Sequence, residues 1–290
     1  MYRNRVKRRI SFQRIVQIIS AVLVNGYLIG FQKGRIFTGG SKAVCVPVLN
    51  CYSCPGALGA CPIGSLQTAL GGMKHHFPFY VLGLLMLFGV VLGRAVCGLL
   101  CPFGLVQDLL HKIPVFRKKK RLPCHRILKY GKYVVLVLLV CAGSLFLFGE
   151  YAKVPAFCKY LCPAGTLFGA IPLLSANEAL RGQAGGLFLW KLGILLAVIL
   201  LSLKVYRPFC QYLCPLGAIY GLFNRFSLVQ IHWEEENCVS CGACERACPV
   251  ALSLQEISRS PECIRCGKCV DACPQKCLHF RGRRAETTKR

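Results

Sequence analysis

Long apolar runs separated by short basic segments dominate the first 226 residues of the chain. Four such runs extend from Ile15 to Phe31, from about Phe77 to Leu92, from Val134 to Phe148 and from Leu187 to Leu203. With flanking aromatic residues, each is near the length needed to cross a hydrocarbon core of about 30 Å. The pattern therefore predicts an all-α membrane domain over residues 1–226, with four transmembrane helices. The first helix is expected to be an uncleaved span, because no small-residue cleavage site follows Phe31.

Lysine and arginine are distributed unevenly between these runs. Six lie in residues 1–14, ten in residues 94–132 and thirteen from Lys204 onward, against four in residues 32–76 and three in residues 150–186. Cytoplasmic segments of membrane proteins carry the excess of these residues, so both termini are expected in the cytoplasm. The chain is accordingly predicted to be a multi-pass protein of a bacterial or archaeal cytoplasmic membrane.

Composition supports a membrane protein that binds metal. Hydrophobic residues make up 54% of the 290 residues, and the mean hydropathy is +0.50, which argues against a soluble two-domain protein. The 21 cysteines are an odd number at short spacings, which argues against a disulfide framework. The formal charge of +26 is spread over the membrane edges instead of one face, so nucleic acid is not an expected partner.

A four-residue motif, Cys-Pro-x-Gly, occurs four times, beginning at Cys61, Cys101, Cys162 and Cys214. Proline suits the first position of a helix, and glycine lets the backbone come close to a ligand. Each motif is therefore expected to start a short helix whose N-terminus faces an anionic cluster.

The expected topology sorts these cysteines into two groups. The inner group, at the cytoplasmic edge, is Cys97, Cys101, Cys210 and Cys214; the outer group, at the opposite edge, is Cys54, Cys61, Cys158 and Cys162. The order of outer motif, helix and inner motif occurs twice, which predicts a parallel internal repeat with two ligands from each half. Each group is predicted to hold one [4Fe-4S] cluster, and Cys51 is an alternative outer ligand. Helix packing or zinc binding is the competing interpretation.

Residues 227–280 predict a small α+β ferredoxin domain with two clusters, followed by a basic tail at residues 281–290. The run C-x2-C-x2-C-x3-C-P occurs twice, and in bacterial ferredoxins the fourth cysteine of each run ligates the other cluster. That rule assigns one [4Fe-4S] cluster to Cys238, Cys241, Cys244 and Cys273, and the other to Cys263, Cys266, Cys269 and Cys248. A zinc module with similar spacing is the alternative.

With these motifs, the chain resembles the polyferredoxin-like membrane proteins that include the NapH-type quinol-dehydrogenase membrane subunit and the NosR-type membrane region. The resemblance rests on the four expected helices with both termini inside, on the inner cysteines and on the ferredoxin run, and it covers most of residues 77–280. It implies electron transfer between a quinol pool or cytoplasmic donor and redox partners outside. The outer cysteines depart from the NapH-type pattern.

The sequence therefore predicts a membrane-bound iron–sulfur protein that relays single electrons between cytoplasmic ferredoxin-type clusters and an outer-face redox partner. Expected partners are the lipid bilayer, a cytoplasmic donor or acceptor, an outer-face flavin or haem protein, and in one version a quinone. The alternatives are a quinol-dehydrogenase subunit of an anaerobic respiratory chain, and a redox-sensing or assembly protein with structural clusters. No motif for chemistry on an organic substrate is found, and whether the chain is an enzyme stays open.

Overall fold

The computed structural model describes residues 2–71, 79–147, 155–257 and 260–280. The chain is mainly helical, and its first half contains α1 (Tyr2–Val24), α2 (Ile29–Lys33), the 3-10 turn η1 (Gly40–Ala43), α3 (Pro62–Gly71), α4 (Phe79–Val91), α5 (Ala95–Leu99), α6 (Pro102–Lys112), α7 (His125–Leu128), α8 (Gly131–Val135) and the π-helical segment η2 (Leu136–Leu147).

The second half consists of short helices and one long helix, α13. It contains α9 (Ala156–Tyr160), α10 (Pro163–Gly165), the π-helical segment η3 (Thr166–Ala170), α11 (Ile171–Ala176), α12 (Glu178–Arg181), α13 (Gly186–Lys204), α14 (Pro208–Tyr212) and α15 (Pro215–Phe223).

The C-terminal module is small and of mixed structure. Strands β1 (Ile231–Trp233) and β2 (Leu278–Phe280) pair antiparallel, with Trp233 opposite Leu278. Between them lie α16 (Ala243–Ala247), the 3-10 turn η4 (Leu254–Glu256) and α17 (Lys268–Ala272). The predicted domain boundary between residues 226 and 227 stays a prediction, and the predicted basic tail at residues 281–290 lies outside the described residues.

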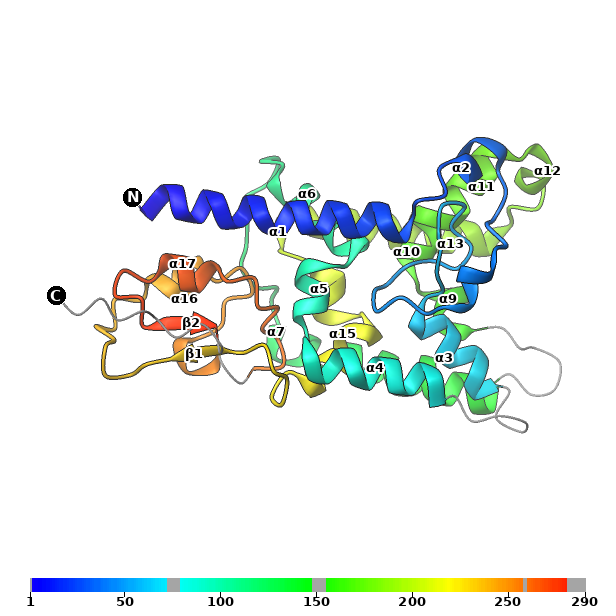
Figure 1. Ribbon diagram of the computed structural model, residues 1–290. Coiled ribbons are helices and arrows are strands. Elements are labelled where there is room, and N and C mark those ends of the chain that lie inside the picture. Colours follow the sequence, from blue (N-terminus) through cyan, green and yellow to red (C-terminus); the bar gives the residue numbers. More distant parts are fainter. Residues whose placement is uncertain (1, 72–78, 148–154, 258–259, 281–290) are drawn as a thin grey trace.

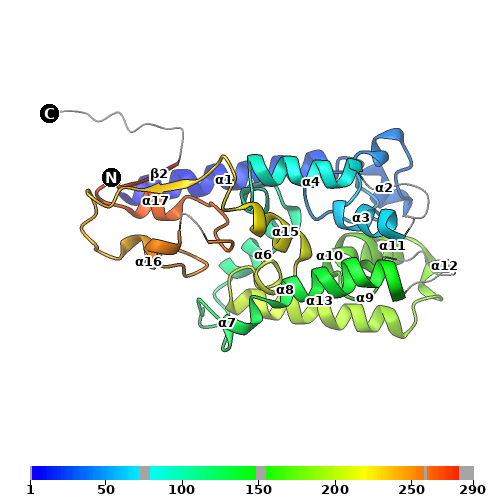
Figure 2. The ribbon, with the colours of Figure 1, turned by 90° about the horizontal axis from the view of Figure 1, so that it is seen from below.

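The short helices that carry the Cys-Pro-x-Gly motifs form the centre of the helical part. Figure 1 shows the C-terminal module at one end, α5 and α15 in the middle, and α3, α9 and α10 toward the other end. The long helices α1, α4 and α13 lie around these short ones (Figure 2). All four motif helices, α3, α6, α10 and α15, begin at the proline, so the predicted helix starts are confirmed.

The prediction of four transmembrane helices is wrong. Within the described residues, two helices are long and apolar enough to cross a membrane, His125–Ser144 and Gly186–Lys204. The first predicted span breaks because α1 ends at Val24 and the chain turns at Asn25. At this turn the backbone forms hydrogen bonds with the loop at residues 56–58 and no longer with the next helical turn. Leu58 N donates to Val24 O at 3.0 Å, and Tyr27 N donates to Gly56 O at 3.1 Å.

The second predicted span is too short in the described residues. Helix α4 has 13 residues, or about 20 Å at 1.5 Å per residue, against a hydrocarbon core of about 30 Å. It stops because Leu228 N donates to Val90 O at 2.8 Å and Gly93 adopts a positive φ of 55°. The hydropathy of a segment carries no information about such long-range backbone contacts. The length of α4 could therefore not be predicted from its apolar sequence.

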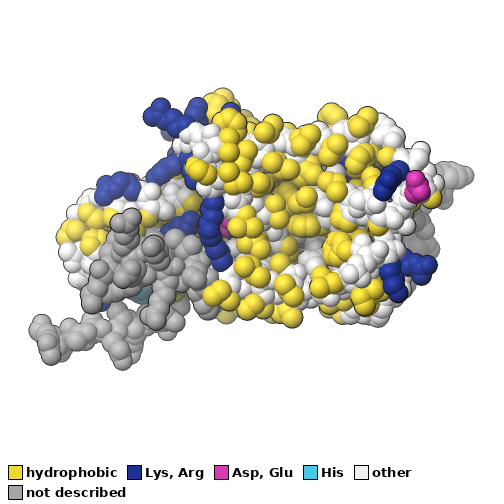
Figure 3. Space-filling view, turned by 90° about the horizontal axis from the view of Figure 1, so that it is seen from above, with side chains coloured by type: hydrophobic (Ala, Val, Ile, Leu, Met, Phe, Trp, Pro, Cys, Tyr) yellow, Lys and Arg dark blue, Asp and Glu magenta, His cyan; other side chains and the backbone are white. Residues whose placement is uncertain are grey.

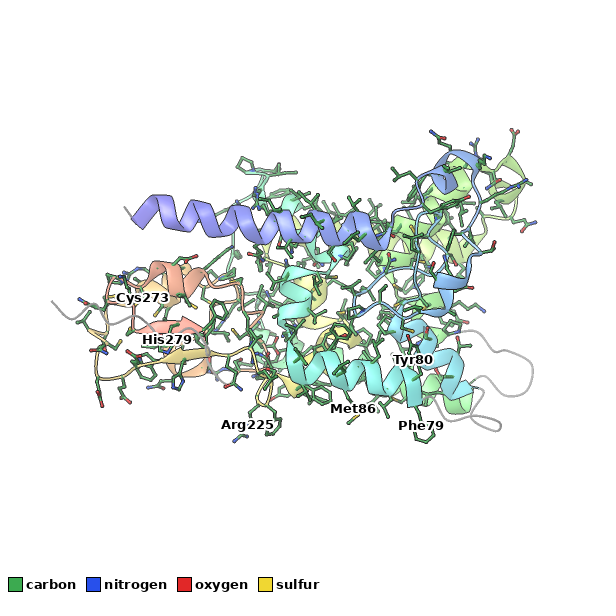
Figure 4. All side chains as sticks on the ribbon, viewed as in Figure 1. Phe79, Tyr80, Met86, Arg225, Cys273 and His279 are labelled. Atoms are coloured by element: carbon green, nitrogen blue, oxygen red, sulfur yellow. The ribbon has the colours of Figure 1, made fainter. Side chains whose placement is uncertain are left out.

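The long helices leave wide apolar surfaces uncovered. On α4, Phe79 is 74% exposed, and it points away from the body of the protein together with Met86 (Figure 4). On α13, Leu189 and Trp190 are more than half exposed. Figure 3 shows hydrophobic side chains across the middle of one face, with Lys and Arg gathered along its border with the C-terminal module and at the far end.

The C-terminal module packs tightly against the start of the inner motif. A Cβ atom on Gly98 of α5 would lie only 2.4 Å from Ile264 O, so the two backbones are in direct contact. The Gly98 carbonyl also accepts hydrogen bonds from Gln13 Nε2 and Gln17 Nε2 of α1, at 2.9 and 2.8 Å. Gly98 is thus the point where α1, α5 and the module meet.

A methyl group at position 98 should force this contact apart. We expect Gly98→Ala to destabilise the protein by about 1–3 kcal/mol, the usual cost of overpacking, because the obstacle is backbone. Gly83→Ala on α4, where nothing lies within 4 Å, is the matched control and should be neutral or slightly stabilising. Thermal unfolding of both variants in detergent checks this; equal melting temperatures would contradict the assigned contact.

Candidate metal centres

The C-terminal module collects its cysteines around two hollows. One hollow is lined by Cys238, Cys241, Cys244 and Cys273, and the other by Cys248, Cys263, Cys266 and Cys269. Gly242 and Gly267, with φ of 67° and 77°, make the turns that start α16 and α17 inside each run. The structure thus brings together the same two sets of four cysteines that the spacing rule predicts.

A fifth thiol, Cys277, joins the first of these hollows. Its Sγ lies 3.2 Å from Cys273 Sγ, and it is almost fully buried. No spacing rule connects Cys277 with the cysteine runs, and β2, which starts at the next residue, brings it there.

The inner group is a compact set of buried thiols. Cys97 lies in α5 and Cys101 directly before α6, while Cys210 lies in α14 and Cys214 directly before α15. Burial raises the pKa of Cys97, Cys101 and Cys210 to about 11, and neighbouring thiols of the same group act in the same direction. Burial and the other three inner thiols together raise the pKa of Cys214. Thiols in such a place need a strong Lewis acid, such as a metal cluster, to lose their protons.

Two buried arginines, which the sequence reasoning missed, tie the inner group together across the repeat. Arg94 Nη2 donates to the Cys210 carbonyl at 2.9 Å, and Arg207 Nη1 donates to the Cys97 carbonyl. Each arginine therefore comes from one half of the repeat and binds the backbone of the other half. The signal was present in the sequence, because both stand three residues before a motif cysteine, as Arg-x-x-Cys.

The motif glycines make room for these arginines. A Cβ on Gly104 would lie 3.2 Å from Arg207 Nη1, and a Cβ on Gly217 would lie 3.3 Å from Arg94 Nη2. Arg207 itself has a left-handed φ of 45°, a conformation that costs a non-glycine residue free energy and persists only where surrounding contacts impose it.

Each arginine has one carboxylate partner. Arg207 forms a two-pronged ion pair with Asp108 of α6, with Nε to Oδ1 at 2.7 Å. Arg94 pairs with Glu262 of the C-terminal module at 2.7 Å, and Glu262 also binds Lys132. Because Arg94, Arg207 and Lys132 are at most 1% exposed, these carboxylates neutralise charges that water cannot reach.

A cavity of about 610 Å³ is lined by three of the predicted outer cysteines, Cys61, Cys158 and Cys162, together with Cys51. These four thiols form the outer group in the structure. Contacts cross the repeat here too. A Cβ on Gly64, of the first half, would lie 3.8 Å from Cys158 Sγ; a Cβ on Gly165, of the second half, would lie 3.7 Å from Cys51 Sγ. Two thiols from each half therefore face one cavity.

Cys54, which the motif alignment favoured as an outer ligand, does not line this cavity. Its Sγ lies 3.5 Å from Asn25 Oδ1, at the turn that ends α1, and it is 1% exposed. The reason is a tight turn in which Cys54 N donates to Cys51 O and Ala57 N donates to Cys54 O. The turn directs Cys51 to the cavity, so the alternative outer cysteine is the one that the structure places with Cys61, Cys158 and Cys162.

Both groups fit an iron–sulfur cluster by the chemistry of their surroundings. Each offers four thiols, the ligands that such clusters use. Within the described part of the chain, each also has a buried donor without a hydrogen-bond partner: Arg94 Nε beside the inner group and Asn50 Nδ2 at the outer cavity. Among the residues described, no three His, Cys, Asp or Glu side chains are close enough to hold one metal ion. Sulfur atoms of a bound anionic cluster would accept hydrogen bonds from the two free donors.

Known proteins match this chain through its iron–sulfur motifs. Residues 75–123, 133–176 and 187–233 match a 4Fe-4S binding domain, and residues 230–252 match a second 4Fe-4S binding domain. The chain therefore carries 4Fe-4S binding domains and resembles the family of ferredoxin-type proteins, so 4Fe-4S clusters are its expected cofactors.

Three curated relatives illustrate the family. An uncharacterised protein of Methanocaldococcus jannaschii is 33% identical over 58% of this chain and 63% of its own length. The methylamine utilization ferredoxin-type protein MauN of Paracoccus denitrificans is 35% identical over 63% of this chain and 59% of its own length. The ferredoxin-type protein NapH of Haemophilus influenzae is 29% identical over 61% of this chain and 54% of its own length.

These matches confirm the predicted family resemblance. The NapH relative and the regulatory protein NosR of Pseudomonas aeruginosa, 28% identical over 54% of this chain, represent the two types that the motifs indicated. The chain covers less than two thirds of the length of the relatives named above. No solved structure matches the fold significantly.

Iron content should distinguish Cys51 from Cys54. We expect Cys51→Ala to lower the iron content by about four atoms per chain, the content of one cubane, because its thiol faces the outer cavity. Cys54→Ala is the matched control, three residues away, and should retain the wild-type iron content. Anaerobic iron analysis with EPR checks both variants. Loss of iron in Cys54→Ala alone would contradict the assignment.

The Glu262 ion pairs should make stability depend on acid pH. Burial alone would raise the pKa of Glu262, but the charges of Arg94 and Lys132 outweigh it, so this pKa lies below its ordinary value of 4.5. A depressed carboxyl pKa contributes stability that is present above about pH 4.5 and is lost as the pH falls through the folded-state value.

We therefore expect Glu262→Gln to cost about 3–5 kcal/mol at pH 7, because it leaves two buried cations unpaired. The variant should also lose part of the wild-type decline in stability below pH 4.5. Glu236→Gln, on an exposed loop of the same module, is the control and should match the wild type. Unfolding followed from pH 3 to pH 7 measures both effects, and parallel pH curves for the wild type and Glu262→Gln would contradict them.

Proposed function

We propose that the chain is a membrane-bound electron carrier with four [4Fe-4S] clusters. Two clusters belong to the C-terminal module, one to the inner group and one to the outer group, with Cys51, Cys61, Cys158 and Cys162 as the outer ligands. Single electrons pass between a cytoplasmic redox partner at the module and a redox protein at the outer end. The observation that carries the proposal is that neighbouring cysteine groups are joined by direct backbone contacts.

The first of these contacts joins the module to the inner group. Gly98 follows Cys97 in the chain, and Ile264 follows Cys263. Gly98 and Ile264 are in backbone contact. Because each directly follows a cysteine, this contact brings Cys263, a predicted ligand of the second module cluster, close to Cys97 of the inner group. Glu262, which directly precedes Cys263, pairs with Arg94, which stands three residues before Cys97. The contact is thus fixed by an ion pair as well as by packing.

The second contact joins the inner and outer groups through one buried loop. Burial raises the pKa of Cys101 to about 11, and a hydrogen bond from the Leu49 backbone opposes this shift. Burial likewise raises the pKa of Cys61 to about 11, and the backbone of Asn50 opposes that shift. Adjacent residues of one loop therefore touch a ligand of each group, and both are at most 2% exposed.

Tyr220 supports the same path. It is fully buried, and its hydroxyl donates to Pro47 O, in the same loop, at 2.8 Å. Burial raises the pKa of Tyr220, and Cys97, Cys101 and Cys61 add to the effect, so its ring lies near thiols of both groups. The ring of Tyr220 and the loop that contains Pro47, Leu49 and Asn50 therefore lie between thiols of the two groups.

The surface favours insertion in a membrane. Only 22% of the most apolar stretch of His125–Ser144 and 17% of that of Gly186–Lys204 is buried, so most side chains of these two helices face outward. Lys and Arg gather where this apolar surface meets the module (Figure 3). This arrangement supports a cytoplasmic module and an outer group near the opposite membrane surface.

A [4Fe-4S] cluster supplies reversible one-electron redox chemistry at each site. The residues of this chain exclude water from the inner group, offset the cluster charge with Arg94 and Arg207, and hold the groups in a fixed series. No side chain has to accept a substrate proton for this function.

Electron transfer across sealed vesicles tests the proposal. Protein reconstituted with its clusters should pass electrons from an external reductant to a trapped acceptor without added quinone. Cys162→Ala should abolish this transfer while leaving the module clusters reducible, because it removes a ligand at the outer end. Cys141→Ala, a cysteine outside the four groups, is the matched control and should transfer electrons at the wild-type rate.

Three outcomes would overturn the proposal. Undiminished transfer by Cys162→Ala would exclude the outer group from the path. Transfer that requires added quinone would favour a quinol-dehydrogenase subunit. Reducible clusters without any transfer would favour a sensing or assembly protein.

A further inference from the structure

A second cavity, of about 350 Å³, lies between α1, α6 and the C-terminal module, apart from the cysteine groups of the helical part. Seven Lys and Arg side chains from separate segments line it, among them Arg14, Lys119, Arg246 and Lys268. Its one carboxylate, Asp108, is already paired with Arg207. Ion pairs found among the described residues involve none of the seven cations. The cavity therefore carries a large uncompensated positive charge.

A buried acceptor without a partner faces the same cavity. Gln17 is fully buried, and its Nε2 donates to Gly98 O at 2.8 Å. Its Oε1 has no hydrogen-bond partner among the residues that the structure describes, although it lies in a side chain that lines the cavity. A buried acceptor without a donor is destabilising, so this oxygen indicates a ligand that brings a donor.

His111 offers a second acceptor at the cavity wall. Its Nδ1 lies 3.1 Å from the Ser202 carbonyl, which can only accept, so Nδ1 carries the proton. Burial lowers the pKa of His111, and the charge of Lys118 lowers it further, against the hydrogen bond to Ser202. The neutral ring therefore has Nε2 free to accept. A fully deprotonated anion such as sulfate has no donor for either acceptor.

The cavity opens at the border of the apolar surface. From Gln17, α1 continues into Ile18 and Val22, which are 52% and 60% exposed. Beyond α6, Val115 is 61% exposed. Basic side chains gather along this border in Figure 3. In a membrane, this is the depth at which phospholipid headgroups lie.

We propose that the cavity binds a phosphate ester that carries a free hydroxyl group, as the headgroup of phosphatidylglycerol does. The phosphate oxygens accept hydrogen bonds from the lysines and arginines, and the hydroxyl donates to Gln17 Oε1. Because the cations come from α1, the loop before α7 and the module, the bound ester joins the module to the helical part beside Cys248. The lipid as the source of the ester rests on the proposed membrane insertion, whereas recognition of the ester does not.

Binding to the full chain in detergent, with its clusters intact, tests this proposal. The probes are short-chain phosphatidylglycerol, the matched phosphatidylethanol without a free hydroxyl, zwitterionic phosphatidylcholine, glycerol 3-phosphate and inorganic phosphate. We expect phosphatidylglycerol to bind about tenfold more tightly than phosphatidylethanol, the value of one good hydrogen bond, and phosphatidylcholine to bind least. Tighter binding of phosphatidylglycerol than of glycerol 3-phosphate identifies a lipid source, and equal binding identifies a soluble ester.

Variants separate the charge from the hydroxyl contact. Lys119→Gln with Lys268→Gln should weaken phosphatidylglycerol at least tenfold, whereas Lys159→Gln, at the opposite end of the molecule, should not. Gln17→Met should bind phosphatidylglycerol and phosphatidylethanol equally. Any of three results would overturn the proposal. The first two are that the wild type binds phosphatidylcholine, or binds inorganic phosphate, as tightly as phosphatidylglycerol. The third is that the double variant and Lys159→Gln bind phosphatidylglycerol with equal affinity. Because no electron transfer is measured, failure here leaves the proposed electron path unaffected.

Discussion

The structure depends on the crossed arginine contacts at the inner group. Arg94 and Arg207 each leave one half of the repeat and bind the carbonyl of a cysteine in the other half. A guanidinium is costly to bury, and both are at most 1% exposed, so each must find hydrogen-bond acceptors and a carboxylate nearby. Meeting that requirement brings α5, α6 and α14 together and with them the four inner thiols. The same contacts use the motif glycines, whose missing side chains leave space for the guanidinium groups.

The two arginines are equivalent in position but not in partner. Asp108 lies on α6, so the Arg207 pair is complete within the helical part. Glu262 lies in the C-terminal module, so the Arg94 pair forms only when the module is docked. Lys132 adds a second buried cation that also depends on Glu262. Docking of the module is therefore required to neutralise the buried charges of Arg94 and Lys132, and Glu262, which does so, directly precedes Cys263. The same ion pairs fix the position of the module cysteines relative to the inner group.

Spacing predicted the local chemistry better than the long-range structure. The two cysteine runs are short, so their turns alone place three thiols together, and the sets around both module hollows agree with the spacing rule. Helix starts at the motif prolines are local as well. The span prediction was wrong because α1 and α4 end at backbone contacts with distant segments, which no hydropathy window contains. The motif alignment favoured Cys54 over Cys51 as the outer ligand, and this choice differs from the structure because the turn between the two residues directs Cys51 to the cavity.

The two groups of the helical part differ in a way that bears on electron flow. The inner group is enclosed and lies beside two buried guanidinium groups, with Arg94 Nε still free to donate. The outer group borders a cavity of about 610 Å³, and the cations that act on Cys51 are Lys42 and Lys191. Positive charge and hydrogen bonds to sulfur stabilise the reduced, more negative form of a cluster and so raise its reduction potential. Exclusion of water and the paired carboxylates of Asp108 and Glu262 act in the opposite direction, because both disfavour added negative charge at the inner group. The two ion pairs therefore decide how much of the positive charge of Arg94 and Arg207 acts on the inner thiols.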